Sequence, residues 1–396
     1  MVTGGFREIG GESGGRGPFA ETGVDSVADF HKEIARSAAG SPADGEGKDL
    51  RDISEQGSGD ERHDCPWFTR MARPGAQENQ RKVAALETES NIVIMANREA
   101  EARKGLFRLM PELKVTKVSP LTGGMSSTML LIEADGPQGL EKFVARFPSE
   151  YVRQIFDDPA AKEAQVLLAA RQIGLPVPSV FGLGEAEDGS FLILEYLEGQ
   201  ATAAPEDPHD FLAQMAQALA GIHSIQFDAQ RFGFLLATRE VYVAPRDELN
   251  AELNEPEIVG ALIAHGEGFR DKDVLRHGDF WPGNLLWQAG KLTGIVDWEN
   301  ALRGPALADL GISRLDVAWI LGFEAMEEFT ARYLEAHPIS VASLAYWDLR
   351  AALRPVRNLS EWVEPYASLG RPDISLEHLQ EVLLRFGDEA LGQYLG

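Results

Sequence analysis

The sequence predicts an α+β protein with two lobes: an N-terminal antiparallel sheet lobe with one helix, then a larger helical C-terminal lobe. Three observations carry this prediction. Short apolar or alternating runs, separated by turn signals, fill residues 114–196. Helical periodicity dominates from Gly199 to the C-terminus. A polar loop followed by two short apolar runs interrupts the helical part at 276–297.

Composition excludes several classes of protein. The 396 residues include 37 Lys and Arg against 62 Asp and Glu, a net charge of −25, which argues against a protein that tracks nucleic-acid phosphates. Cys65 is the single cysteine, so neither an intrachain disulfide nor a thiolate zinc site can form. No run of about 18 apolar residues is present to span a bilayer. We therefore expect a cytoplasmic protein without nucleic-acid or membrane partners.

Residues 1–94 differ from the rest of the chain. They hold 14 of the 40 glycines and only 16 Leu, Ile, Val or Phe. Such a segment buries too little apolar surface to offset its chain entropy, so we expect a disordered extension or loose helix. Met95 opens a plausible helix at Ala96–Arg103. Residues 1–94 are therefore either an extension or the product of a mis-assigned start, with translation beginning at Met95.

The N-terminal lobe, 95–198, is predicted to contain five strands and one main helix. The helix begins at Asp158-Pro159, presents Glu163, Val166 and Leu167 on one face, and ends at Gly174-Leu175-Pro176. An Asp135-Gly136 pair signals a turn between two strands. The expected strands are Lys114–Val118, Met129–Glu133, Phe143–Phe147, Ser179–Leu183 and Phe191–Tyr196.

The C-terminal lobe, 199–396, is predicted to be mostly helical. Apolar residues from Phe211 to Ile222 recur at helical spacing, and Leu310–Tyr333 and Leu376–Tyr394 are each expected to form a helix. The lobes join near Glu195–Gly199. Because ligands commonly bind between lobes, we expect a site beside this junction.

The polar loop and the hairpin behind it bring three oxygen-bearing side chains together. Asn284 stands at the start of the strand Leu285–Trp287, and Asp297 follows the strand Leu292–Val296, with Asp279 on the preceding loop. Mg²⁺ on a nucleotide takes a few hard oxygen ligands from the protein. A further carboxylate, held off the metal, can accept a hydroxyl proton.

The two motifs here, His277-Gly278-Asp279 with Asn284 and Ile295-Val296-Asp297-Trp298-Glu299, resemble those of the aminoglycoside phosphotransferase family. The resemblance covers about residues 114–335. It implies a two-lobed kinase-like fold and Mg²⁺-dependent transfer of the γ-phosphoryl group of ATP or GTP to a hydroxyl of an aminoglycoside-like or other small molecule. Asp279 would be the catalytic residue, and Asn284 and Asp297 would bind the metal.

The resemblance also implies a nucleotide-binding set. The turn at 121–128 would cover the phosphates, although a Gly-Gly hairpin turn is the commoner meaning of such a segment. Arg146 replaces the lysine of protein kinases and would clamp phosphates, with Glu163 as its partner; two ordinary surface charges are the alternative. Backbone groups at the lobe junction would meet the purine. The residues implied are Gly123, Gly124, Ser126, Ser127, Arg146, Glu163, Glu195 and Leu197.

Other polar residues are better explained by structure than by chemistry. His223 follows apolar residues on a predicted helix, so we expect a hydrogen-bonded core histidine. His277 is expected to hold its loop, because the adjacent Asp279 suits the role of base better. Gly304 and Asp309 are expected to brace the same loop.

The acceptor is less well defined by the sequence. A cationic acceptor is one hypothesis, since acidic residues gather in the helical lobe; a solvated face is the alternative. Trp319, Trp347 and Trp362 would either line an apolar acceptor site or pack in the core. Rival functions are an inactive nucleotide-binding pseudokinase or interaction module, and a metal-dependent hydrolase. The acidic residues are Glu240, Asp247, Glu248, Glu252, Glu255 and Glu257.

Overall fold

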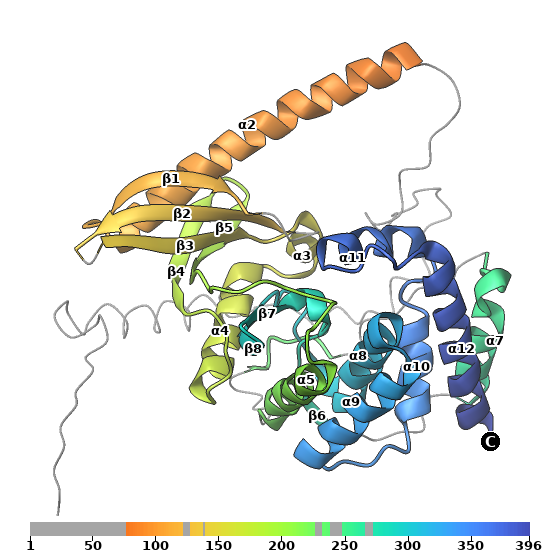
Figure 1. The fold of residues 1–396 in the computed structure, drawn as a ribbon. Coiled ribbons are helices and arrows are strands. Elements are labelled where there is room, and N and C mark those ends of the chain that lie inside the picture. The colour runs from red at the N-terminus through yellow and green to blue at the C-terminus, as the bar shows by residue number, and fades with distance from the viewer. Residues whose placement is uncertain (1–76, 122–126, 138, 226–231, 238–247, 266–271) are drawn as a thin grey trace, which may run out of the picture. The chain divides into compact units, whose positions relative to one another are not determined.

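The N-terminal part of the chain forms one antiparallel sheet in the order β1-β2-β3-β5-β4 (Figure 1). The computed structural model describes residues 77–121, 127–137, 139–225, 232–237, 248–265 and 272–396, without the side chains of 77–92, 151 and 265. All five predicted strands are confirmed. Asp135-Gly136 belongs to the end of β2, so the predicted turn falls just after it. The strands are β1 Lys114–Pro120, β2 Thr128–Gly136, β3 Gly139–Phe147, β4 Val180–Ala186 and β5 Gly189–Glu195.

Three helices accompany the sheet: α2 (Gln77–Leu109), α3 (Glu150–Ile155) and α4 (Pro159–Gln172). α2 begins at Gln77, before the helix expected from Met95 onward. Near its C-terminal end, Ala102 and Leu106 pack in the hydrophobic core of the sheet. α4 begins as its sequence predicts, because the Asp158 side chain accepts a hydrogen bond from the Ala161 N–H. α4 packs against β4 and β5.

The central strand β3 presents Arg146 to the face of the sheet opposite the hydrophobic core. Phe143, Ala145 and Phe147 belong to the core with α2. Because successive side chains of a strand alternate between its faces, Arg146 points to the other side. It lies opposite Met129 of β2 and Leu192 of β5.

The C-terminal part is mainly helical, as predicted, with one correction. The single helix expected over Leu310–Tyr333 is wrong, because α8 ends at Leu321 and α9 begins at Phe323. Gly322 separates them with a φ of 87°, a left-handed conformation that ends an α-helix. The helix predicted at the C-terminus is present as α12. Within the described residues, the α-helices of this part are α5 Pro208–Ser224, α7 Glu255–His265, α8 Ala306–Leu321, α9 Phe323–Ala336, α10 Leu344–Ala352, α11 Glu364–Ser368 and α12 Leu376–Leu395.

Two small strand pairs frame the polar loop. β6 (Asp273–Arg276) pairs with β9 (Leu302–Pro305), and the predicted hairpin is confirmed as β7 (Leu285–Gln288) and β8 (Lys291–Ile295). The hairpin is tied to the sheet part of the chain, since the Ile295 N–H donates to Pro176 O at 2.7 Å. Among the described helices, none is long and apolar enough to cross a membrane.

Candidate active site

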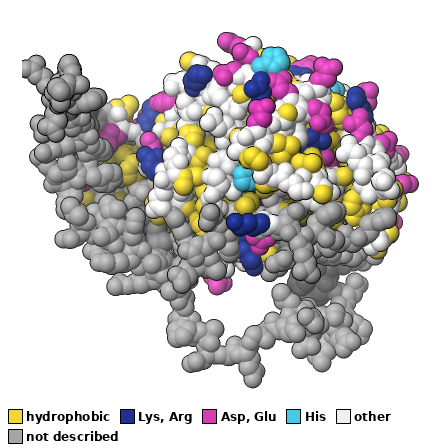
Figure 2. Space-filling model, turned by 90° about the horizontal axis from the view of Figure 1, so that it is seen from below, with side chains coloured by type: hydrophobic (Ala, Val, Ile, Leu, Met, Phe, Trp, Pro, Cys, Tyr) yellow, Lys and Arg dark blue, Asp and Glu magenta, His cyan; other side chains and the backbone are white. Residues whose placement is uncertain are grey.

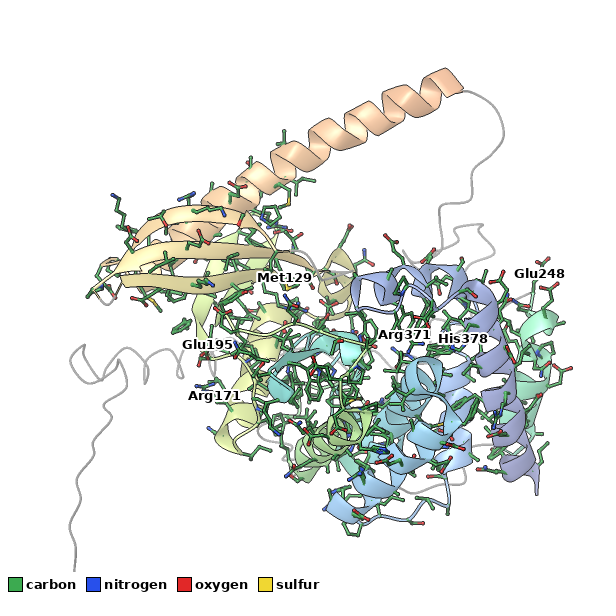
Figure 3. All side chains as sticks on the ribbon, viewed as in Figure 1. Met129, Arg171, Glu195, Glu248, Arg371 and His378 are labelled. Carbon is green, nitrogen blue, oxygen red and sulfur yellow. The ribbon has the colours of Figure 1, made fainter. Side chains whose placement is uncertain are left out.

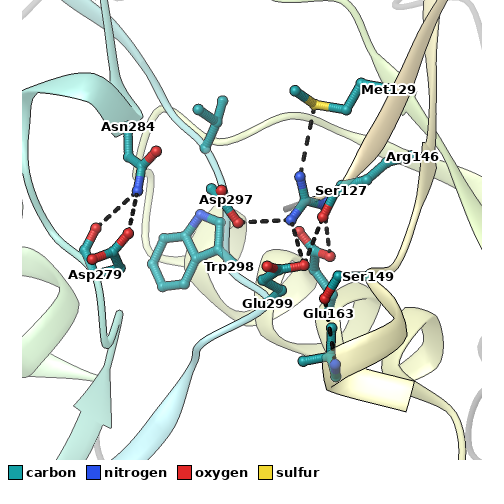
Figure 4. A network of polar contacts seen from close by, with 12 residues as sticks. Ser127, Met129, Arg146, Ser149, Glu163, Asp279, Asn284, Asp297, Trp298 and Glu299 are labelled. Atoms are coloured by element: carbon teal, nitrogen blue, oxygen red, sulfur yellow. Dashed lines mark hydrogen bonds and ion pairs between the residues drawn. The ribbon is translucent and has the colours of Figure 1, made fainter. Parts of the chain in front are cut away.

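Asp279 and Asn284 face each other across the loop between β6 and β7. The Asn284 amide nitrogen donates to the Asp279 backbone oxygen at 2.9 Å and to its Oδ2 at 3.2 Å. The Asn284 backbone oxygen accepts from the Val296 N–H at 2.9 Å, which links the loop to the residue before Asp297. Figure 4 shows Asn284 next to Asp279, on the same side of the network as Asp297, with its amide oxygen turned away from Asp279. The predicted convergence of these residues is therefore present.

Arg146 ties the sheet to Asp297. Its Nη2 lies 2.7 Å from Asp297 Oδ1 and 3.3 Å from Glu299 Oε2, and its Nε donates to Glu163 Oε2 at 3.0 Å. The guanidinium is 3% exposed. Although burial disfavours its charge, the three carboxylates outweigh that penalty and raise the pKa of Arg146. Arg146 therefore stays charged, and the expected pair with Glu163 is present rather than two isolated surface charges.

Glu299 connects this ion cluster to the segment before β2. Its Oε2 accepts from the Ser127 hydroxyl at 2.6 Å (Figure 4). Its backbone oxygen accepts from Lys162 Nζ at 2.6 Å, and the same ammonium lies 4.0 Å from the centre of the Phe156 ring. Burial lowers the pKa of Lys162 to about 8, because Glu163 and Glu299 only partly offset it. Ser127, Lys162 and Glu299 thus belong to the same buried network.

Asp309 of α8 anchors the start of the polar loop. Asp309 accepts from Arg276 Nη2 at 2.6 Å and from the His277 N–H at 2.7 Å. Burial opposes ionisation, but the charge of Arg276 holds the pKa of Asp309 below its usual range. Gly278 has a φ of 83°, and a Cβ there would lie 2.1 Å from Asn300 O, so only glycine fits. The predicted bracing role of Asp309 is confirmed.

Both conspicuous histidines have structural partners, as predicted. His277 Nε2 lies 3.0 Å from Val296 O. His223 Nδ1 lies 2.7 Å from the Tyr333 hydroxyl, and its Nε2 lies 3.5 Å from Asp309. Burial lowers the pKa of both imidazoles, which favours their neutral forms. Gly304 lies in β9, which pairs with β6 directly before the loop.

Asn284 contacts one carboxylate oxygen of Asp279, and the segment that follows α10 contacts the other. Arg354 Nη2 lies 2.7 Å from Asp279 Oδ1, and its guanidinium carbon lies 5.6 Å from the centre of the Trp362 ring. Tyr366 contacts Trp281 edge to face and donates to Asp316 Oδ1 at 3.4 Å. Burial raises the pKa of Asp316 to about 8, partly offset by Arg354. This side of Asp279 therefore combines aromatic side chains with the ion pair between Arg354 and Asp279.

The remaining predicted nucleotide residues are placed as follows. Gly123, Gly124 and Ser126 lie outside the described residues. Glu195 ends β5; its N–H donates to Ser179 O at 2.9 Å, and its carboxylate accepts from the Ser179 hydroxyl at 2.6 Å. Leu197 follows in the junction and is half-buried. Their nucleotide contacts stay predictions.

The acidic residues considered for a cationic acceptor do not form one described surface. Glu240 and Asp247 lie outside the described residues, and Glu255 is buried, accepting from the Asn250 N–H. Figure 3 places Glu248 beside α7, far from Met129, which contacts Arg146. On the face shown in Figure 2, acidic, basic and hydrophobic side chains are interspersed. The cationic acceptor stays a prediction.

The three tryptophans differ in position. Trp319 and Trp347 are buried, as core packing requires, whereas Trp362 is half-buried beneath Arg354. Lys162 and Arg354 were not anticipated. Lys162 directly precedes Glu163, so its place on α4 was a usable signal. Arg354 lies 75 residues beyond Asp279, and no motif connects them.

The donor set at Asn284 and Asp297 suits a magnesium ion. Among the described residues, no group of three or more His, Cys, Asp or Glu forms a metal site. Mg²⁺ on a nucleotide needs only one or two carboxylates besides phosphate and water oxygens. Arg146 engages one carboxylate oxygen of Asp297, Oδ1. The amide oxygen of Asn284 is turned away from Asp279. Asn284 and Asp297 together therefore still offer hard oxygen donors to a metal ion.

The sheet followed by helices, with the loop and hairpin at their contact, defines an α+β protein with a two-lobed, kinase-like fold. A model of the phosphotransferase enzyme family matches residues 117–355, more than half of the sequence. The chain belongs to this family, which confirms the resemblance of its two motifs.

Individual relatives are distant. A probable ketoamine kinase of Staphylococcus aureus (strain NCTC 8325 / PS 47) is 23% identical over 259 residues, covering 58% of this chain and 82% of that protein. Aminoglycoside phosphotransferase APH(4)-Ia is 18% identical with a TM-score of 0.50, covering 73% of this chain and 99% of that one. The GDP complex of aminoglycoside 2'-phosphotransferase-IIIa is 16% identical with a TM-score of 0.49, covering 73% and 98%. The likeness to APH(4)-Ia supports the fold.

Proposed function

We propose that this protein is a small-molecule kinase that transfers the γ-phosphoryl group of ATP or GTP to an acceptor hydroxyl. The observation that carries the proposal is the grouping of Asp279, Asn284 and Asp297, joined to Arg146 of the sheet. In the proposed division, 95–198 is the nucleotide-binding lobe and 199–396 is the catalytic and acceptor-binding lobe. Membership of the phosphotransferase family supports this reading.

Asp279 is the proposed catalytic residue. It accepts the proton of the acceptor hydroxyl while the hydroxyl oxygen bonds to the γ-phosphorus and the bond from that phosphorus to the β,γ-bridging oxygen breaks. Asn284 orients Asp279 through its amide nitrogen. Asn284 and Asp297 would hold Mg²⁺, which when bound supplies neutralisation of phosphate charge.

Arg146 is the proposed phosphate clamp, with Glu163 fixing its Nε. A guanidinium retains unused N–H donors after forming several ion pairs, and its charge favours an anionic ligand. Gly123, Gly124, Ser126 and Ser127 are the proposed phosphate-covering turn. Glu195 and Leu197 are the proposed backbone contacts to the purine.

The proposed acceptor is a ketoamine, a sugar-derived amine with free hydroxyls. The relative from Staphylococcus aureus supports this choice. The alternative function is a nucleotide-binding protein without transfer activity. It is favoured by one observation: both site aspartates are paired with arginines.

A coupled nucleotide-consumption assay separates the two functions. ATP and GTP are each supplied with Mg²⁺ and a panel of ketoamines, amino sugars, macrolides, choline-like amines and simple sugars. A kinase releases ADP or GDP faster when one acceptor is added. Nucleotide binding without acceptor-stimulated release from any member of the panel would instead support the inactive protein.

Substitutions then test the assigned roles. We expect Asp279→Asn to lower kcat by about 10²–10⁴-fold while nucleotide binding persists. Asp297→Ala should also lose Mg²⁺-dependent nucleotide binding, measured by calorimetry. Asp273→Asn is a matched control, because Asp273 is equally half-exposed and pairs with Arg303 instead. Normal turnover in the Asp279 variant would refute the assignment.

A further inference from the structure

Both carboxylate oxygens of Asp279 have partners in this structure. Oδ2 accepts from the Asn284 amide at 3.2 Å, and Oδ1 accepts from Arg354 at 2.7 Å. If Asp279 is the base proposed above, an acceptor hydroxyl must reach one of these oxygens. Asn284 is buried, whereas the Arg354 side chain is 32% exposed. Arg354 is therefore the partner that an acceptor can replace.

When Arg354 leaves Asp279, water solvates its partly exposed guanidinium, which is then available to a negatively charged group of the acceptor. The guanidinium lies over Trp362, and an aromatic face alone does not replace a full counter-charge. Asp316 is a buried carboxyl close enough to both Arg354 and Asp279 to feel their charges. Because burial raises the pKa of Asp316 to about 8, it is mostly protonated near neutral pH and supplies little charge.

We infer that Arg354 is a specificity-determining residue that binds a carboxylate of the acceptor, with Trp362 beneath its guanidinium. The inference rests on the proposed kinase function and narrows its acceptor class. The planar fork of arginine matches a carboxylate, and one carboxylate balances the single charge of Arg354. The pairing releases Asp279 Oδ1 for the acceptor hydroxyl, so acceptor binding and exposure of the base are coupled.

A matched pair of ketoamines tests the inference. One is 1-deoxy-1-glycino-fructose, which carries a carboxylate, and the other is the corresponding amide, in which a neutral carboxamide replaces the carboxylate. We expect KM to be about 10- to 100-fold lower for the acid than for the amide in the wild-type protein, because a charge-assisted bond is lost in the amide. Arg354→Gln should bring the two KM values within about threefold of each other, and Arg354→Lys should restore part of the difference.

Arg385→Gln is the control for removing an arginine that has both a carboxylate partner and an aromatic contact. Arg385 pairs with Glu389 at 2.8 Å and lies 3.8 Å from the centre of the Phe323 ring, so it also combines an ion pair with an aromatic contact. It should retain the full preference for the acid. Thermal melting verifies that each variant is folded.

Binding measurements keep this test separate from the proposed function. Calorimetry follows each ketoamine into protein loaded with Mg²⁺ and a non-hydrolysable ATP analogue. Binding of the acid alone, lost in Arg354→Gln but without phosphoryl transfer in the assay, supports the inference and refutes the kinase. Equal binding of acid and amide, binding of neither, or a preference that survives Arg354→Gln overturns the inference.

Discussion

Two arginines each hold one aspartate of the candidate site, and they do so at the same distance. Arg146 Nη2 lies 2.7 Å from Asp297, and Arg354 Nη2 lies 2.7 Å from Asp279. Their surroundings differ. Arg146 comes from the central strand of the sheet and is 3% exposed, whereas Arg354 follows α10 and is 32% exposed.

The equal distances therefore do not imply equal contributions to the stability of the protein. Around Arg146, removal of the cation would leave several carboxylates with little access to water, which is costly. Around Arg354, water can solvate both partners when they separate, so the pair contributes little to stability and can exchange readily. The buried arginine suits a fixed framework. The exposed one suits a contact that opens when an acceptor arrives.

The largest effect is expected for Arg146→Met. This change removes the positive charge facing Glu163, Asp297 and Glu299 and should lower the free energy of unfolding by about 3–5 kcal/mol. Urea unfolding followed by circular dichroism measures the loss. Arg146→Lys keeps the positive charge but lacks the planar fork of the guanidinium, so its free energy of unfolding should lie between those of Arg146→Met and the wild-type protein. A loss below about 1 kcal/mol for Arg146→Met would show that the buried cluster is not the framework described here.

The difference between the two arginines also explains what the sequence predicts. Arg146 is found through the family resemblance, because it stands in the predicted strand Phe143–Phe147 where protein kinases keep a lysine. Asp279, Asn284 and Asp297 are found because a short loop and hairpin bring them together over few residues. Arg354 follows α10, which packs against α8, and it reaches Asp279 by a long-range contact that leaves no local pattern.

The prediction of a single helix over residues 310–333 was wrong because a local pattern again carried too little information. Apolar spacing continues through Gly322, but its left-handed conformation ends α8, and a separate helix, α9, begins at Phe323. Periodicity reports which faces are buried and does not report a break of one residue. The partners of Ser127 and Lys162 likewise depend on the approach of Glu299 from the hairpin.

Asp316 offers a second way to compare the two sides, because it is a buried carboxyl beside the exposed pair. Arg354, Asp279 and Tyr366 are the groups that affect its ionisation. Its pKa in the folded protein, about 8, lies above its ordinary value of 3.8. The stabilising effect of its protonated form is thus fully present below pH 3.8 and is lost as pH rises through 8.

We therefore expect Asp316→Asn to remove part of the pH dependence of stability. Relative to this variant, the wild-type protein should lose up to about 2.5 kcal/mol between pH 6 and pH 8, since each pH unit contributes at most about 1.4 kcal/mol. Urea unfolding at several pH values measures the difference. Asp210→Asn, at an exposed carboxylate on α5, is the control and should run parallel to wild type. Parallel curves for Asp316→Asn would mean that Asp316 is charged at neutral pH.

The smallest effect on stability is expected for Arg354→Gln, and this smallness is what separates the two arginines. An ion pair between partly exposed side chains contributes about 0.2–1 kcal/mol, and Asp279, at 26% exposed, remains hydrated without it. The melting temperature should therefore change by no more than about 4 °C. Raising the salt concentration should narrow the gap between Arg354→Gln and wild type, because ions screen exposed charges, while the gap for Arg146→Lys should persist. A loss for Arg354→Gln as large as that for Arg146→Met would place Arg354 in the rigid framework, and an acceptor would then be unable to displace it from Asp279.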